Sequence, residues 1–320
     1  MFKKLFGSQP HAESRTASRE AQTGGKKQID WLASQLRDQK YVADSDLLSS
    51  LYLMDSLAKP LLLEGDAGVG KTEVARCLAA AHDTQLLRLQ CYEGLNAHQA
   101  LYDWDYPRQL LAIQMTSEDQ RSGLKKSIYS EEYLLKRPLL SAITATKPAV
   151  LLIDEIDRAD EEFEALLLEL LSDFQVSIPE MGTVKAKSIP KVILTSNGVR
   201  ELSDALKRRC LYHYIDFPDF SKELEIIETR LPHIDRTLAN QLVSFVQSLR
   251  DENLRKTPGI AESIDWAMAL MDLGVKSLND DDKSIIMQSL SCLLKTQEDV
   301  TLVKEKFSDL LDLKSGSVTN

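Results

Sequence analysis

The chain has 320 residues and a formal net charge of −10 at pH 7, with 43% hydrophobic and 28% charged residues. This length allows about two domains, and the composition is that of an ordinary soluble protein. The negative charge argues against attraction of the whole protein to nucleic acid or to an anionic membrane, so no nucleic-acid partner is expected.

Several kinds of site are disfavoured by residue patterns. The four cysteines form no C-x-x-C pair and the five histidines form no H-E-x-x-H motif, which predicts reduced thiols and no zinc centre. No stretch reaches the roughly 18 apolar residues that a transmembrane helix needs. Residues 1–6 are basic and apolar, which leaves a short interfacial anchor or, more simply, a flexible tail. We expect a cytoplasmic protein.

The chain divides into segments of different character. The first residues are rich in Ser, Thr, Gln, Gly and charge, which is typical of disorder. Apolar residues then recur at helical spacing over 29–36 and 47–57, and only helical patterns occur after about Phe220. The predicted segments are a disordered tail (1–28), an α/β core (29–219), a small all-α domain (220–313) and a flexible tail (314–320).

A glycine-rich loop follows the first predicted strand, which covers residues 60–63. Strand, loop and helix in this order favour phosphate binding, because loop N–H groups and the helix N-terminus both face an anion. Lys71 would reach the β- and γ-phosphates, and the Thr72 hydroxyl would take one Mg²⁺ position. The predicted nucleoside triphosphate site consists of Gly65, Asp66, Ala67, Gly68, Val69, Gly70, Lys71, Thr72 and Glu73.

Strand and helix patterns alternate along the rest of the core. This alternation predicts a parallel, doubly wound sheet with helices on its faces. The predicted elements are strands at 86–89, 149–153, 192–195 and 211–217, helices at 107–115, 137–145 and 161–171, and a β-hairpin over 174–190.

Polar residues end two of the predicted strands, where active groups lie in such sheets. Asp154 would hold Mg²⁺ through water, and Glu155 would polarise the water that attacks the γ-phosphate. A solvated strand end is the alternative interpretation of this pair. Asn197 ends the next strand, where its amide could bind the water or the γ-phosphate, or could serve as a turn residue before Gly198.

A basic cluster, Lys207-Arg208-Arg209, follows a short helix that begins after Ser203. A guanidinium from this cluster would neutralise transition-state charge at the γ-phosphate of a neighbouring subunit. Basic residues at a helix C-terminus also stabilise the helix dipole, and both roles can hold together.

The ordered set of motifs resembles the AAA+ ATPases over about residues 29–312. The motifs are GDAGVGKT, VLLIDEID, ILTSN and LSDALKRRCLYHY, followed by helices. Similarity to the MoxR family lies in LLLEGDAGVGKTEVAR, RPLLSAI and DEIDRADEEFEALLLELLSDF. Similarity to its CoxD-like branch, which is associated with carbon monoxide dehydrogenase maturation, lies in YDWDYPRQLLAI and LKRRCLY. The resemblance implies a three-layer P-loop AAA+ domain followed by a small all-α lid domain.

The resemblance also implies a role for each matching residue. Lys71 and Thr72 would be Walker-A residues, Asp154 and Glu155 Walker-B residues, and Asn197 sensor 1. Arg209 occupies the arginine-finger position, and Arg208 is the alternative candidate for that role. Tyr41 and Val42 lie where members of the family contact adenine. The inserts at 95–117 and 174–190 would face the ring pore or the substrate.

One stretch departs from the family pattern. A sensor-2 arginine usually follows the proline of a stretch that here reads Arg255-Lys256-Thr257-Pro258-Gly259-Ile260-Ala261-Glu262, and none does. Arg255 or Lys256 could reach the phosphates instead, and the sensor-2 role stays unassigned.

The implied function is Mg²⁺-dependent ATP hydrolysis in a homo-oligomer, expected to be a hexameric ring. It would remodel or mature a client, such as a molybdenum-containing metalloenzyme, with a von Willebrand A-domain protein as partner. Two other functions compete: a nucleic-acid AAA+ loader, and an ATP-binding scaffold that scarcely hydrolyses. The acidic charge and the lack of a DNA-binding motif disfavour the loader. Glu155 and Arg209 disfavour the scaffold.

Overall fold

The structure, a computed structural model, describes residues 12–115, 128–279 and 283–312. Its strands are β1 (Leu61–Glu64), β2 (Leu86–Gln90), β3 (Tyr102–Trp104), β4 (Leu134–Lys136), β5 (Val150–Asp154), β6 (Gln175–Ile178), β7 (Gly182–Lys185), β8 (Lys191–Ser196) and β9 (Leu211–Tyr214). Its α-helices are α1 (Ala12–Asp38), α2 (Ser45–Leu57), α3 (Lys71–Ala81), α4 (Ala97–Leu101), α5 (Tyr106–Met115), α7 (Pro138–Thr144), α8 (Glu161–Asp173), α9 (Asp204–Arg209), α10 (Phe220–Arg230), α11 (Arg236–Arg250), α12 (Ile260–Asp272), α13 (Lys283–Ser289) and α14 (Gln297–Asp312).

Five parallel strands form the central sheet in the order β2-β5-β8-β1-β9. Glu64 at the end of β1 pairs with Ser196 at the end of β8, and Gln90 of β2 pairs with Asp154 of β5. Parallel neighbours need crossover connections, which the helices between the strands supply. The predicted parallel, doubly wound sheet is confirmed, and the carboxyl ends of β1, β5 and β8 meet at one edge.

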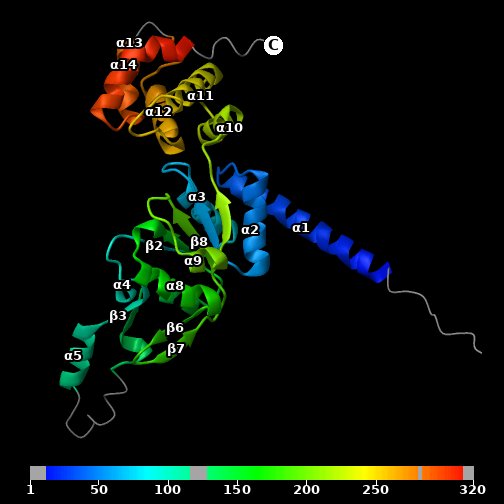
Figure 1. Cartoon of the computed structure of the whole chain (residues 1–320), viewed down its shortest axis with the longest axis vertical. Coiled ribbons are helices and arrows are strands. Elements are labelled where there is room, and N and C mark those ends of the chain that lie inside the picture. The colour runs from blue at the N-terminus through cyan, green and yellow to red at the C-terminus, as the bar shows by residue number, and fades with distance from the viewer. Residues whose placement is uncertain (1–11, 116–127, 280–282, 313–320) are drawn as a thin grey trace, which may run out of the picture.

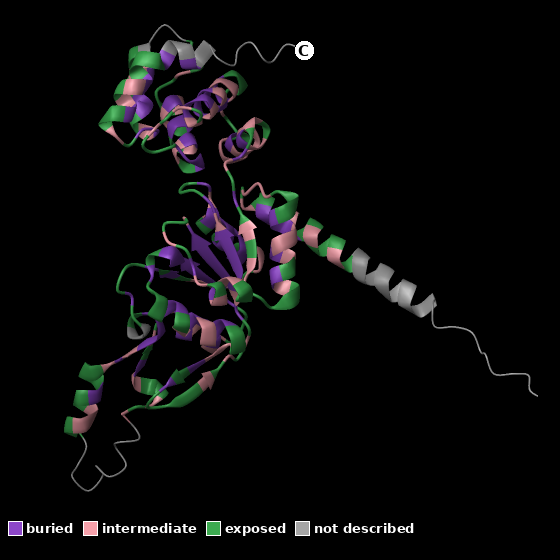
Figure 2. Ribbon diagram, viewed as in Figure 1, coloured by how far each residue is buried: buried purple, intermediate pink, exposed green. Residues whose placement is uncertain are grey.

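Alternate strand residues point into two separate cores, because side chains of a strand alternate between its faces. Leu62 packs in the core that contains α7 and α8, whereas Leu61 and Leu63 pack with α2 and α3. Figure 2 shows the buried strands between helices whose outer faces are exposed. The expected three-layer arrangement is therefore correct. A third core holds α10 to α14 together, at one end of the molecule in Figure 1.

Helix α1 begins earlier than the sequence predicts. It starts at Ala12, although a disordered tail is expected through residue 28. Ala, Glu, Arg and Gln have high helix propensity, and they extend the packed end of the helix, where Leu32 and Leu36 are fully buried. Figure 1 shows the rest of α1 projecting away from the body. The predicted tail at 314–320 lies outside the described residues.

Small elements between β2 and β5 were not expected. Helix α4 has five residues, and the antiparallel strands β3 and β4 have three each. Elements this short give no periodic hydrophobic pattern in the sequence. Helix α5 follows and projects at the end of the molecule opposite to the helical domain (Figure 1). The last residues of the insert predicted over 95–117 lie outside the described ranges. Strand β9 is also shorter than predicted, since it ends at Tyr214.

Two further features bear on the sequence predictions. None of the helices in the described ranges has the length and apolar character that a bilayer span requires. The described cysteines, Cys77, Cys91, Cys210 and Cys292, are free thiols. Burial raises the pKa of Cys91 to about 12, so this thiol stays protonated and unreactive at neutral pH.

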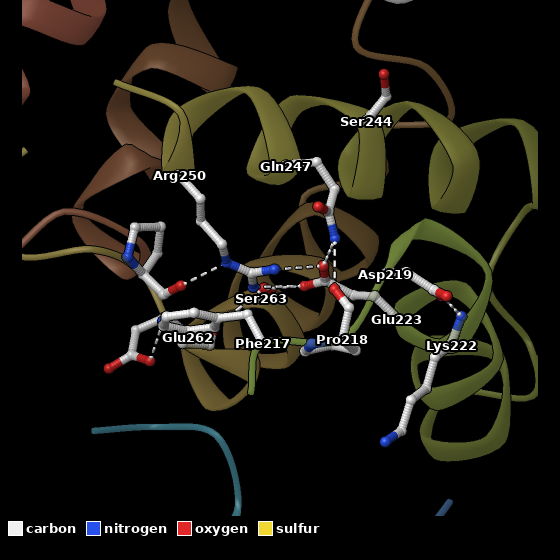
Figure 3. A network of polar contacts seen from close by, with 12 residues as sticks. Phe217, Pro218, Asp219, Lys222, Glu223, Ser244, Gln247, Arg250, Glu262 and Ser263 are labelled. Atoms are coloured by element: carbon white, nitrogen blue, oxygen red, sulfur yellow. Dashed lines mark hydrogen bonds and ion pairs between the residues drawn. The ribbon is translucent and has the colours of Figure 1, made fainter. Parts of the chain in front are cut away.

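A buried ionic network around Glu223 holds the helical domain together (Figure 3). Glu223 of α10 is fully buried, and its two oxygens accept hydrogen bonds from the Arg250 Nη1 and Nη2 atoms, each at 2.7 Å. Gln247 and Ser263 donate to the same carboxylate at 2.6 and 2.9 Å. Arg250 also donates to the carbonyl oxygen of Pro258, just before α12. The network therefore fixes α10, α11 and α12 relative to one another.

Glu223→Ala is expected to lower the free energy of unfolding by about 3–5 kcal/mol, because it leaves the buried Arg250 charge without a partner. The control is Glu225→Ala on the same helix. Its exposed pair with Arg37, at 2.6 Å, is worth about 0–1 kcal/mol. Urea unfolding followed by circular dichroism measures both variants. Equal losses would show that the network does not stabilise the helical domain.

Candidate nucleotide-binding site

The glycine-rich loop connects β1 to α3 at the carboxyl edge of the sheet. Gly65, Gly68 and Gly70 have φ angles of 156°, 83° and 94°, a region that favours glycine. A Cβ atom at Gly65 would lie 2.1 Å from the carbonyl oxygen of Ile215, so no other residue fits there. The backbone path of the loop therefore depends on the glycines that the sequence motif supplies.

Lys71 places a buried cation inside this loop. Its side chain is 6% exposed, and Nζ donates to the carbonyl oxygens of Gly65 and Asp66 at 2.8 and 2.7 Å. Burial lowers the pKa of Lys71, while nearby carboxylates, that of Asp157 first among them, act to raise it. The ammonium group is thus held at the place where the sequence predicts phosphate contacts.

Asp154, at the end of β5, accepts hydrogen bonds from residues of α3, β8 and β2. Its Oδ1 atom accepts hydrogen bonds from the hydroxyls of Thr72 at 3.1 Å and Thr195 at 2.6 Å. Its Oδ2 atom accepts from Arg88 Nε at 3.0 Å and Nη2 at 2.5 Å. The structure therefore brings Thr72 and Asp154 together, as the predicted metal pair requires. Arg88 and Thr195 were not found from the sequence, because they precede their strand ends.

Glu155 has an unusual backbone for its residue type. Its φ and ψ angles are 55° and 50°, in the left-handed region that non-glycine residues rarely adopt. Its N–H donates to Thr195 Oγ1 at 2.9 Å, and its carboxylate pairs with Arg158 Nε at 2.9 Å. Strained residues held by surrounding contacts are common at functional sites, which supports a functional role for Glu155.

Asn197 follows β8, in a loop that two buried carboxylates anchor. Asp157 Oδ2 accepts the backbone N–H groups of Asn197 at 3.1 Å and Val199 at 2.9 Å. Further along, Glu164 pairs with Arg200 and accepts the N–H of Ser203. Asn197 is thereby fixed at the carboxyl edge, next to the ends of β1 and β5. Asp157 and Glu164 were not singled out in the sequence, since their positioning roles have no motif.

A cavity of about 350 Å³ lies between the loop, the chain before α2 and the helical domain. Tyr41 and Val42, the predicted adenine contacts, line it together with residues 68–70. Burial raises the pKa of Tyr41, so its hydroxyl is protonated at neutral pH. Glu73 also lines the cavity, where its carboxylate pairs with Arg76 and with Arg230 of α10, each at 2.6 Å. Its predicted nucleotide contact stays a prediction.

Residues 60–210 match the family described as AAA domain (dynein-related subfamily). The match spans less than half of the 320 residues. The matched residues contain the loop, Asp154, Glu155, Asn197 and the basic cluster of α9, but not Tyr41 and Val42.

Other known proteins match a larger part of the chain than this family does. An uncharacterized protein of Staphylococcus haemolyticus is 26% identical over 245 residues, which covers 74% of this chain and 85% of that protein. An uncharacterized protein of Staphylococcus aureus is 27% identical over 239 residues, covering 72% and 82%. A structure described as the Thermotoga maritima RuvB Holliday junction branch migration motor has 17% identity and a TM-score of 0.40, covering 90% of this chain and 76% of that one. These values carry no conclusion about function.

The two arginines at the end of α9 differ in their contacts within the α/β part of the chain. Arg209 Nε donates to Ser172 Oγ at 2.5 Å, and its Nη1 donates to the carbonyl oxygen of Ala205 at 3.1 Å. Arg208 is exposed and forms no hydrogen bond or ion pair within the described ranges. Among the described residues, neither side chain forms a hydrogen bond or an ion pair with the phosphate-binding loop.

The start of α12 contacts the glycine-rich loop directly. The Ile260 N–H donates to the carbonyl oxygen of Gly68 at 3.0 Å, and a Cβ at Gly259 would lie 2.7 Å from Gly68 Cα. Arg255 and Lys256, the alternatives for sensor 2, line a second cavity beside residues 66–68. Arg255 also pairs with Glu298 at 2.5 Å. The close backbone contact of Gly259 and Ile260 with Gly68, which has no motif, thus links the helical domain directly to the loop.

Proposed function

We propose that the protein is an ATPase of the MoxR type that hydrolyses ATP with Mg²⁺. The observation that carries this proposal is the convergence of Lys71, Thr72, Asp154 and Glu155 at one edge of the sheet, with Thr72 Oγ1 and Asp154 Oδ1 3.1 Å apart. A buried lysine, a hydroxyl and two carboxylates beside a glycine-rich loop are the groups that phosphoryl transfer requires.

The residues present suit Mg²⁺. A threonine hydroxyl and a carboxylate are hard oxygen donors, and Mg²⁺ is usually held by one or two protein oxygens together with phosphate oxygens and water. Within residues 12–115, 128–279 and 283–312, no group of three or more His, Cys, Asp and Glu could hold a metal by itself. Thr72 and Asp154 would therefore hold the ion jointly with the nucleotide, and it would neutralise charge on the phosphates.

Each residue of the site has a distinct task in this proposal. Lys71 exchanges its carbonyl contacts for oxygens of the β- and γ-phosphates, and the loop N–H groups bind the remaining oxygens. Glu155 accepts a proton from the attacking water, and Asn197 orients that water. Tyr41 and Val42 contact the base in the cavity beside α10 and α12.

We further propose a hexameric homo-oligomer in which an arginine of α9 acts on the site of the next subunit. Exposure of both Arg208 and Arg209, and their lack of contact with their own loop, supports action in trans. Arg209 remains the first candidate for the arginine finger. A positive charge there would stabilise the transition state as negative charge shifts on the γ-phosphate.

The cellular role that we propose is remodelling or maturation of a client protein, in the manner of the CoxD-like branch. The client would be a molybdenum-containing metalloenzyme, with a von Willebrand A-domain protein as partner. Support comes from α5, which projects from the body and exposes Leu110, Leu111 and Met115 by 59%, 58% and 86%. Exposed apolar groups of this kind can bind partly unfolded chains.

Calorimetric titration with magnesium-ATP tests the proposal. Lys71→Ala is expected to weaken ATP binding at least about tenfold, since it removes a charge-assisted contact worth about 1.5–3 kcal/mol. The control is Lys59→Ala, an exposed lysine just before β1 that leaves the charge of the site unchanged. The proposal fails if the unsubstituted protein does not bind ATP, or if both variants bind it equally well.

A further inference from the structure

Arg88 reaches the metal-binding carboxylate from the neighbouring strand. It lies on β2, where its backbone pairs with Leu152, and Gln90 pairs with Asp154 itself. The side chain therefore extends along the sheet toward the carboxyl edge. There its Nε and Nη2 atoms donate to Asp154 Oδ2 at 3.0 and 2.5 Å, and Nη2 also donates to Gln90 Oε1 at 2.7 Å.

The two oxygens of Asp154 have different partners. The Thr72 and Thr195 hydroxyls both donate to Oδ1, whereas Arg88 is the donor to Oδ2. Thr72 lies in the first turn of α3, directly after the loop, so Oδ1 is the oxygen that faces the loop and the predicted metal position. Oδ2 faces β2. A two-donor contact from one planar guanidinium fixes both the direction and the plane of a carboxylate.

Burial makes this contact more than a surface ion pair. The Asp154 side chain is 4% exposed, while that of Arg88 is 53% exposed. A buried carboxylate needs compensation for lost hydration, and Arg88 supplies the cation that contacts it. Because the guanidinium itself remains half in water, its contribution to overall stability is small. Its main consequence is the orientation of the Asp154 carboxylate.

We propose that Arg88 is a positioning residue for the metal of the nucleotide site. By holding Oδ2, it keeps Oδ1 turned toward Thr72, so that the ion and its water meet a carboxylate already in place. This inference rests on the proposed Mg²⁺-ATP site. Groups that hydrogen-bond a metal-binding carboxylate from outside typically change metal affinity by about 10–100-fold.

The test measures Mn²⁺ binding by electron paramagnetic resonance, in the presence of a saturating, non-hydrolysable ATP analogue. Arg88→Met is expected to weaken Mn²⁺ binding by about 10–100-fold. Arg88→Lys keeps the charge but loses the two-donor geometry, so an intermediate loss is expected. Binding of the analogue in EDTA should change less than about twofold, because Arg88 is inferred to act on the metal and not on the nucleotide.

Arg137→Met is the matched control. Arg137 is half-exposed and pairs with Asp103 at 3.5 Å, away from Asp154, so its loss should leave Mn²⁺ affinity unchanged. The inference is overturned if Arg88→Met binds Mn²⁺ as the unsubstituted protein does. It is also overturned by tighter binding, which would make Arg88 a competitor of the metal, and by weaker analogue binding in EDTA.

Other results separate this inference from the proposed function. If Arg88→Met does not fold, the Arg88→Lys variant decides, and equal Mn²⁺ affinity in that variant and the unsubstituted protein overturns the two-donor role. Failure of the unsubstituted protein to bind Mn²⁺ with the analogue would instead refute the proposed nucleotide site.

Discussion

Glu155→Gln should bind magnesium-ATP as tightly as the unsubstituted protein, yet hydrolyse it at least about 100-fold more slowly. The amide has the same shape as the carboxylate but cannot accept a proton from water. The surrounding structure should tolerate the change, since the left-handed backbone of Glu155 is held through its N–H bond to Thr195 Oγ1 at 2.9 Å. Phosphate release under saturating ATP measures turnover, and titration calorimetry measures binding.

Glu162→Gln is the control for this result. Glu162 is exposed in the first turn of α8, so the substitution removes the same charge without touching the proposed chemistry of the site. Its turnover should stay within about twofold of the unsubstituted protein. If Glu155→Gln hydrolyses ATP at the unsubstituted rate, Glu155 is not the general base.

Arg209→Ala should reduce turnover by about 1,000-fold or more, the usual effect of an arginine finger. ATP binding to a single subunit should be unchanged, since Arg209 contacts Ser172 and Ala205 and not its own loop. Arg208→Ala should have a smaller effect. The control is Lys207→Ala, which removes a neighbouring charge that pairs with Glu201 at 3.0 Å.

The pattern of losses decides between the two arginines. A larger loss of turnover with Arg208→Ala would identify Arg208 as the arginine finger. Its side chain is exposed and forms no hydrogen bond or ion pair in the described part of the chain. Turnover that survives replacement of both Arg208 and Arg209 would refute a finger from α9. Turnover and size-exclusion chromatography are measured together, so that loss of assembly is recognised.

Much of the fold could be predicted because its signals are local. Runs such as Leu61–Leu63 and Val150–Ile153 bury both faces of their strands, and this produces continuous apolar stretches. The glycine-rich loop can be recognised in the sequence because the backbone angles at Gly65, Gly68 and Gly70 require glycine. The start of α1 differed from prediction, since its first residues follow helix propensity although their composition is typical of disorder.

The site was predictable only where its residues form motifs. Thr72 and Asp154 stand in such motifs, so their contact across 82 positions could be anticipated from strand order. Arg88 and Thr195 could not, because each reaches the site from inside a strand. Asp157 acts through the backbone N–H groups of Asn197 and Val199, a contact that leaves no pattern in the sequence. The same holds for Gly259, whose contact with Gly68 depends on how the helical domain packs.

Mixing two inactive variants tests the central claim most directly. Lys71→Ala cannot hold the triphosphate, and Arg209→Ala cannot complete its neighbour's site, so each alone should be nearly inactive. In an equimolar mixed ring, about a quarter of the sites would combine an intact Lys71 with an intact Arg209 from the next subunit. We predict that mixing restores turnover to about a quarter of the unsubstituted rate. A mixture as inactive as its components, although it forms mixed rings, would contradict catalysis between subunits.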